Sequence, residues 1–343
     1  MLNKALLFIM AACMGSLLTK LHIPIPFLLG GMVTALVCKM IGHGRVNVDW
    51  PKRWRGYGLM ISGYGIGATF NEQSWQNFID EMAGVVEANV IAISVSVLLA
   101  WIITKRTRFN FESCVMGMMP GGITLMMLLT EQYKRANPNA VMVMQILRLF
   151  GVIVSVPFLV IYCLDARIVG SSVAMPNLGG IHWLVFVPLS ILGGYIATRI
   201  HLPTPQLLGA ILLTALFSVE VGQLQPVPGW LMAAAQISIG LYMGQLLDAD
   251  KLAQTRELLP YTLIGTAILI IVSVGVAYMM AGQYGFSLVT AFLAMAPGGI
   301  AEMALAGMSM GENVSLILTY QLVRVLAINV LVPPVLAWYF KEK

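Results

Sequence analysis

Long apolar segments dominate this sequence and alternate with short polar stretches. The segments lack the strict apolar–polar alternation that indicates β-strands. An α-helix needs roughly 20 apolar residues to cross a bilayer, so the pattern predicts an all-α polytopic membrane protein. The apolar segments lie at 4–20, 26–42, 56–71, 84–104, 113–130 and 139–163, and again at 182–198, 206–221, 230–247, 259–281, 288–309 and 314–338.

The composition supports a membrane protein. The chain of 343 residues is 59% hydrophobic and only 10% charged, and its mean hydropathy is +0.85. Soluble domains carry about 25% charged residues, and a soluble fold of this length could not bury so much apolar surface. The composition argues against a secreted enzyme, a disordered chain or a DNA-binding regulator. We expect the lipid bilayer as a partner and no nucleic acid.

The two halves of the chain repeat each other with a period of about 177 residues. Residues 20–31 (KLHIPIPFLLGG) align with 199–210 (RIHLPTPQLLGA), and 116–127 (MGMMPGGITLMM) align with 293–304 (LAMAPGGIAEMA), each with six identities in twelve positions. Further matches follow in the same order: Gln145 and Arg148 with Gln321 and Arg324, Pro157 with Pro333, and the GxxxG pair Gly63 and Gly67 with Gly240 and Gly244.

The fifth apolar segment of each half contains a Pro-Gly-Gly sequence, residues 120–122 and 297–299. Proline and glycine break a helix and free its backbone polar groups, so we expect a re-entrant segment there. Each half then has five transmembrane helices, and the odd number inverts the second half relative to the first. The sequence thus predicts two inverted repeats of five transmembrane helices, each with one re-entrant, broken segment.

The distribution of basic residues favours this inverted arrangement. Lys and Arg are enriched in cytoplasmic loops. Lys39, Arg148 and Arg324 lie within predicted spans and are left out of the count. With a cytoplasmic N-terminus, the inverted arrangement places fifteen of the other Lys and Arg inside and two outside, against eleven and six for a parallel one. We expect a multi-pass protein of the bacterial inner membrane with cytoplasmic N- and C-termini. Its first repeat would span 1–165 and its second 181–343, joined by a linker at 166–180.

The paired Pro-Gly-Gly sequences are the first candidate site, and their members are Pro120, Gly121, Gly122, Pro297, Gly298 and Gly299. A helix that begins inside the membrane presents free N–H groups and a partial positive charge. Two such ends near the bilayer midplane would attract an anion. The alternative is that both sequences only kink or pack helices.

Arg148 and Arg324 lie about ten residues into apolar helices, too deep to reach the membrane surface easily. An arginine at that depth costs about 2.5–3.5 kcal/mol on insertion scales. Gln145 and Gln321 lie on the same helical faces. Two compatible interpretations stay open: these side chains contact an anionic substrate, or they bind the carbonyl groups of the broken segment.

Glu302 follows the second Pro-Gly-Gly sequence by three residues and aligns with Leu125, so it breaks the symmetry of the repeat. It is a candidate for a salt bridge with Arg324 or for carrying a coupling proton. Asn329 aligns with Ile153 and is a second candidate for ion coupling.

Signatures of catalysis and metal binding are missing from the sequence. The four cysteines form no CxxC, the four histidines are scattered, and there is no HExxH sequence or nucleotide-binding loop. We therefore expect neither an enzyme nor a cofactor or metal.

The two Pro-Gly-Gly motifs, the second extended as APGGIAEM (296–303), and the QxxR sequences that follow them resemble the AbrB-type membrane protein family of bacteria. That family carries two labels, ammonia monooxygenase and regulator of gene expression. Neither follows from these residues, because an oxygenase needs a cluster of metal ligands and a transcription factor needs a nucleic-acid-binding surface. The five-plus-five plan also resembles the bacterial glutamate and citrate sodium symporters, in which paired Gly-rich hairpins line the substrate site.

From these features we expect a secondary transporter for a small, anionic, organic acid-like solute, coupled to H⁺ or Na⁺. Alternating access would operate around a mid-membrane site between the two Pro-Gly-Gly segments. The alternative is a non-transporting membrane regulator or sensor that affects gene expression, and a membrane monooxygenase has the least support. The GxxxG pairs suggest close helix packing and a homodimer.

Overall fold

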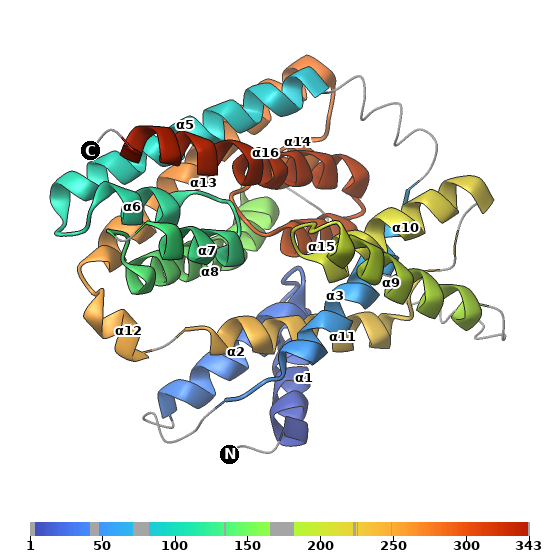
Figure 1. Ribbon diagram of the computed structural model, residues 1–343. Coiled ribbons are helices and arrows are strands. Elements are labelled where there is room, and N and C mark those ends of the chain that lie inside the picture. The colour runs from blue at the N-terminus through green and yellow to red at the C-terminus, as the bar shows by residue number, and fades with distance from the viewer. Residues whose placement is uncertain are drawn as a thin grey trace. The chain divides into compact units, whose positions relative to one another are not determined.

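The computed structural model describes residues 4–41, 48–70, 82–133, 135–164, 182–221, 224, 226–247 and 249–341. These residues form fifteen α-helices and no β-strand (Figure 1). The structure thus confirms the all-α class. The expected linker at 166–180 lies outside the residues described.

The chain folds into two compact units, and each unit combines pieces of both sequence halves. Unit 1 contains Met1–Asn77, Val160–Leu247 and Ala304–Ser315, and unit 2 contains Phe78–Leu159, Asp248–Met303 and Leu316–Lys343. The first three apolar segments of each half thus belong to unit 1, and the last three form most of unit 2. The repeat boundaries at 1–165 and 181–343 describe the sequence and stay a prediction.

Unit 1 is built from six main helices, and helices from one half of the sequence pack on helices from the other. Helix α2 packs on α1 and α11, and α10 packs on α9 and α3; Figure 1 shows α2 beside α11 and α9 beside α10. The helices are α1 (Lys4–Lys20), α2 (Pro26–Ile41), α3 (Lys52–Gly67), α9 (His182–Arg199), α10 (Pro205–Val221) and α11 (Gly229–Gln245).

The GxxxG glycines allow these helices to approach closely. A Cβ atom at Gly63 would lie 2.7 Å from the carbonyl oxygen of Leu207, and one at Gly240 would collide with the carbonyl oxygen of Leu28. Leu28 and Leu207 are themselves matched in the repeat. The expected close packing is confirmed. Because these glycines contact helices of the same chain, they lend no support to the homodimer, which stays a prediction.

The duplication extends to the backbone of the turns between α1 and α2 and between α9 and α10. His22 and Ile25 have φ angles of 54° and 49°, and their counterparts His201 and Thr204 have 57° and 46°. Positive φ is rare for residues other than glycine, and more so for β-branched ones. The same uncommon turn geometry therefore occurs once in each half.

The longest helices among the described residues lie wholly or mostly in unit 2. The helices of unit 2 are α5 (Met82–Arg106), α6 (Phe111–Met118), α7 (Ile123–Gln132), α8 (Pro138–Tyr162), α12 (Ala249–Gln254), α13 (Leu258–Tyr284), α14 (Leu288–Met295), α15 (Ile300–Met310) and α16 (Val314–Lys341). Three of these helices also extend into unit 1: most of α15, the last residues of α8 and the first residues of α16.

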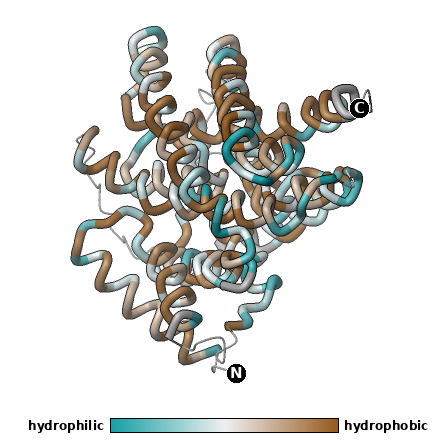
Figure 2. The backbone as a smooth tube through the Cα atoms, turned by 90° about the vertical axis from the view of Figure 1, so that its left-hand side faces the viewer, coloured by the Kyte–Doolittle hydropathy of each residue, from teal (hydrophilic) through white to brown (hydrophobic). Residues whose placement is uncertain are grey.

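Four of the described helices are long and apolar enough to cross a membrane, namely α5, α8, α13 and the part of α16 from Val314 to Leu336. They form two pairs matched in the repeat, α5 with α13 and α8 with α16. Figure 2 shows hydrophobic colour along most of the helices and hydrophilic colour mainly near their ends. The fold is thus that of a helical membrane-type protein. The count of ten transmembrane helices and their inverted arrangement stay predictions.

Candidate functional site

Each Pro-Gly-Gly sequence separates two short helices. Helix α6 ends at Met118 and α7 begins at Ile123, while α14 ends at Met295 and α15 begins at Ile300. Gly122, which precedes α7, has a φ of 87°, a conformation that glycine adopts without strain. The expected interruption of the fifth apolar segment is therefore present in both halves.

Gln145 and Arg148 of α8 bind carbonyl groups at the end of α6. The amide nitrogen of Gln145 donates to the carbonyl oxygens of Met116 at 2.6 Å and Met119 at 2.8 Å. The guanidinium of Arg148 donates to Met118 at 3.4 Å and to the side-chain oxygen of Gln145 at 2.8 Å. The last carbonyls of a helix have no hydrogen-bond partners within the helix. The side chains of Gln145 and Arg148 supply the missing donors at the end of α6.

Gln321 and Arg324 of α16 make the matching contacts with the end of α14, and make more of them. Arg324 also donates to the side-chain oxygen of Gln321. The two side chains reach five carbonyl groups at distances of 2.9–3.3 Å, those of Leu293, Ala294, Met295, Ala296 and Gly298. A salt bridge to Glu302 is not among the contacts of Arg324 in the described part of the chain.

Both arginines are buried, with 4% of Arg148 and 2% of Arg324 exposed. The acceptors of their hydrogen bonds are uncharged in both cases. The Nε–H group of each is buried and has no acceptor among the residues described. The interpretation that these side chains bind the carbonyls of the broken segments is confirmed. Substrate contact, which is compatible with it, stays a prediction.

Glu302 lies on the first turn of α15 and is only 2% exposed. Its carboxylate lies over Gly299, because a Cβ atom at that glycine would collide with Oε2. A carboxylate there offsets the partial positive charge of the helix N-terminus, as a glutamate in a capping box does. The first half has Leu125 at this position, and a Cβ atom at Gly122 would meet open space. The start of α7 therefore has no counterpart of this carboxylate.

Pro120 and Pro297 line the same narrow cavity, together with residues of α5 and α13. The space measures about 10 Å³, close to the minimum that one water molecule needs. The hydroxyl of Ser96 in its wall donates to Ala92 at 2.8 Å, and that of Ser273 donates to Met295 at 3.2 Å. The structure brings the two prolines together and leaves no room between them for a larger molecule.

Asn329 lies on α16, one residue after Ile328, whose side chain contacts Gly121. The side-chain oxygen of Asn329 is buried and accepts no hydrogen bond from the described residues. Its candidate role in ion coupling stays a prediction.

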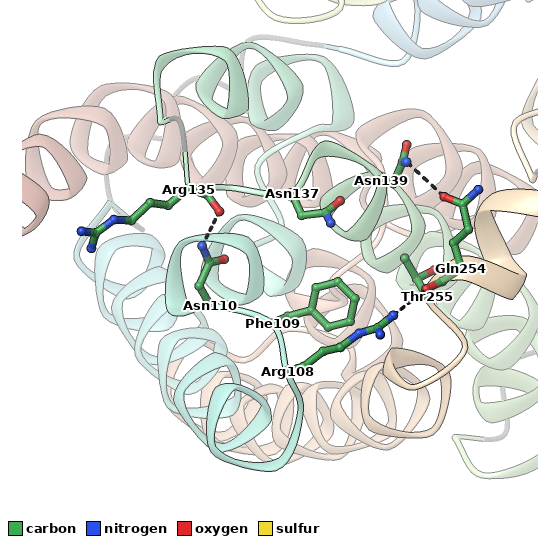
Figure 3. Close-up of a pocket in the computed structure, with 8 residues that line it drawn as sticks. All are labelled: Arg108, Phe109, Asn110, Arg135, Asn137, Asn139, Gln254 and Thr255. Atoms are coloured by element: carbon green, nitrogen blue, oxygen red, sulfur yellow. Dashed lines mark hydrogen bonds between the residues drawn. The ribbon is translucent and has the colours of Figure 1, made fainter.

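The structure also contains a second, polar pocket that the sequence analysis does not predict, because there its arginines, Arg108 and Arg135, enter only the count of basic residues used for topology. It has a volume of about 560 Å³, and all of its lining residues belong to unit 2 (Figure 3). Its residues are Arg108–Asn110 after α5, Arg135, Asn137 and Asn139 around the start of α8, and Gln254 and Thr255 at α12. The available signal was the presence of Asn110 and Asn137, typical N-cap residues, just after basic residues.

Comparisons with known proteins place these motifs in a family. A family model described as "Transition state regulatory protein AbrB" matches residues 27–340. "Uncharacterized protein YhjN" from Bacillus subtilis (strain 168) is 25% identical over 355 residues, covering 97% of this chain and 92% of the relative. "Putative regulator AbrB" from Escherichia coli (strain K12) is 23% identical over 329 residues, or 92% of each protein. Since the family model spans most of the chain, the protein belongs to the AbrB family.

Proposed function

We propose that this protein is a secondary transporter for a small anionic solute, with two inverted repeats and re-entrant Pro-Gly-Gly segments. One observation carries the proposal: the two broken segments are matched in the repeat, and their prolines line one cavity between long apolar helices. Irregular backbone at membrane depth is tolerated only where it is buried in protein or lines a cavity. Broken helices around a central site recur in secondary transporters.

The charges around the broken segments support an anionic solute. Arg148 and Arg324 are buried cations whose hydrogen-bond acceptors are uncharged, and within the described residues the Nε–H of each has no acceptor. A buried charge without a counter-ion is costly, and a bound anion would offset that cost. We assign the solute to the start of α7, beside Gly122, because Glu302 already supplies the negative charge at the matching position of α15.

Transport through this site requires movement, because the cavity at the two prolines holds no more than a water molecule. In the proposed cycle, α5 and α13 separate from the Pro-Gly-Gly segments to open the site on one side of the membrane at a time. Glu302 and Asn329 offer buried oxygen atoms for H⁺ or Na⁺ coupling. The bias of the basic residues assigns the protein to the bacterial inner membrane with cytoplasmic termini.

Uptake into proteoliposomes tests the proposal. The full-length protein is reconstituted and challenged with labelled monocarboxylates, dicarboxylates and inorganic anions under an H⁺ or Na⁺ gradient. We expect gradient-driven uptake of at least one of them. Leu125→Glu places a carboxylate at the start of α7, as in the second half, and lowers uptake at least about tenfold because like charges repel. Leu125→Gln, of similar size but neutral, retains most of the uptake.

A non-transporting membrane regulator or sensor is the second candidate, favoured by the name of the family and by that of the Escherichia coli relative. It would bind a ligand at the same site and pass a signal through the loops. Ligand binding without flux of any solute, in vesicles that hold a gradient, would favour this function and reject transport.

A further inference from the structure

Three candidate membrane spans end beside the polar pocket of unit 2, and if they cross the bilayer the pocket lies at the level of the lipid headgroups. Helix α5 ends at Arg106, α8 begins at Pro138 and α13 begins at Leu258. On the last turns of α5, Trp101 is 48% exposed and Lys105 Nζ lies 3.7 Å from the centre of its ring. Tryptophan and lysine are characteristic of the membrane–water interface.

Two helix N-termini open into this pocket. Asn110 is the N-cap of α6, and its side-chain oxygen accepts from the backbone N–H of Ser113 at 3.3 Å. The side-chain oxygen of Asn137 accepts from the N–H of Ala140 at 3.1 Å, at the start of α8. Helix N-termini carry partial positive charge and bind phosphate and other anions. In Figure 3 the side chain of Asn137 points toward the middle of the pocket.

Two arginines lie at the rim of the pocket, and one of them, Arg108, is already paired with a carboxylate. Arg108 extends past Phe109 toward Thr255 in Figure 3 and donates to the carbonyl oxygen of Gln254 at 3.2 Å. Its Nε lies 3.5 Å from Oε2 of Glu257. Arg135 is exposed, and its guanidinium points away from the other labelled side chains. A long exposed side chain can turn toward a ligand at little cost, and the guanidinium fork matches the oxygens of a phosphate.

The second half of the chain retains the polar and aromatic positions of this pocket but lacks its charge. Phe109 aligns with Phe286 and Asn137 with Asn313, but Arg108 aligns with Gly285. Between 285 and 313 there is neither Lys nor Arg. The second half forms the matching short helix α14 and the break after it with no basic residue between 285 and 313. Arg108 and Arg135 are therefore not needed to build the corresponding part of the first half.

We propose that the pocket binds a phosphate group, carried either by the headgroup of an anionic phospholipid or by a small soluble phosphate compound. Arg108 and Arg135 bind the phosphate oxygens, and the amides of Asn137 and Gln254 donate to the rest of the ligand. The volume of about 560 Å³ accommodates a headgroup, and basic pockets between transmembrane helices are known to bind anionic headgroups. The proposal does not depend on whether the protein transports a solute.

Native mass spectrometry of the full-length protein in detergent tests this proposal. Phosphatidylglycerol and phosphatidylcholine are titrated against the wild type, Arg108→Gln/Arg135→Gln, and the control Lys52→Gln/Arg53→Gln. The control removes two exposed basic residues from α3 of unit 1. We expect the arginine variant to bind phosphatidylglycerol roughly 10- to 30-fold more weakly than the wild type. The control variant and phosphatidylcholine binding are expected not to change.

Inorganic phosphate distinguishes the two sources of the ligand. Displacement of phosphatidylglycerol by millimolar phosphate supports a soluble ligand, and unaffected lipid binding supports a lipid headgroup. Arg108→Lys/Arg135→Lys keeps both positive charges and is expected to retain binding. If Arg108→Gln/Arg135→Gln does not fold, the single variant Arg135→Gln takes its place. Equal binding of both phosphatidylglycerol and inorganic phosphate by the wild type and the arginine variant would overturn the proposal.

Discussion

The break between α6 and α7 and the break between α14 and α15 have the same backbone plan and different charges. In both, a Gln–Arg pair from a following long helix binds the carbonyls of the preceding short helix. In the second, Glu302 covers the start of α15, whereas the first has Leu125 there. The arginines thus bind carbonyl groups at both breaks, whereas a carboxylate lies at the start of the second helix only at the second break, among the residues described. This difference is the reason for assigning the proposed anionic solute to the first break.

The largest expected effect follows from removing the arginine with more contacts. Arg324→Met removes a donor from each of the carbonyls of Met295, Ala296 and Gly298. Ser273 still donates to Met295 and Gln321 to Ala296, so the carbonyl of Gly298 is the one left without a donor among the described residues, and an unsatisfied buried group costs about 1–3 kcal/mol. Arg148→Met affects the carbonyl of Met118, which is bound at 3.4 Å. We expect a clearly larger drop in thermal unfolding temperature in detergent for Arg324→Met. A larger drop for Arg148→Met would contradict the ranking of the two breaks.

The glycines of unit 1 provide a contrasting comparison, in which the two halves should behave alike. Gly63→Ala and Gly240→Ala each force a methyl group against a backbone carbonyl, and such overpacking costs about 1–3 kcal/mol. The control is Gly275→Ala in α13, where a Cβ atom meets open space and alanine is about 1 kcal/mol better than glycine in a helix. We expect similar losses of thermal stability for the first two variants and none for the control. Unequal losses would show that the two interfaces are not equivalent.

A smaller effect tests the charge difference between the breaks directly. Glu302→Leu makes the second break resemble the first and removes the carboxylate from the start of α15. The expected loss of stability is about 0.3–2 kcal/mol, the range for a charge at a helix terminus. Glu302→Gln is the matched control, because it keeps the side-chain length and loses only the charge. If both variants were as stable as the wild type, the carboxylate would not stabilise this helix. Uptake that no longer follows the imposed gradient would assign Glu302 to coupling.

The sequence was sufficient for features that depend on local chemistry. The apolar segments predicted the helices, and Pro120 and Pro297 with their glycines marked where the fifth segments break. The spacing of the GxxxG pairs predicted close packing. These predictions succeeded because helix formation, helix breaking and close approach depend on residue types at short separations.

The tertiary structure decided which distant segments contact one another, and local sequence patterns do not predict those contacts. It joined segments of both halves in each compact unit, and it gave Gln321 and Arg324 their particular carbonyl acceptors. It also placed the carboxylate of Glu302 against Gly299 at the start of α15. The polar pocket is likewise assembled from residues of three separate segments. Arg108 and Gln254 are 146 positions apart in the sequence. The free energy of such a contact depends on how all the helices pack, and a local sequence pattern therefore cannot predict it.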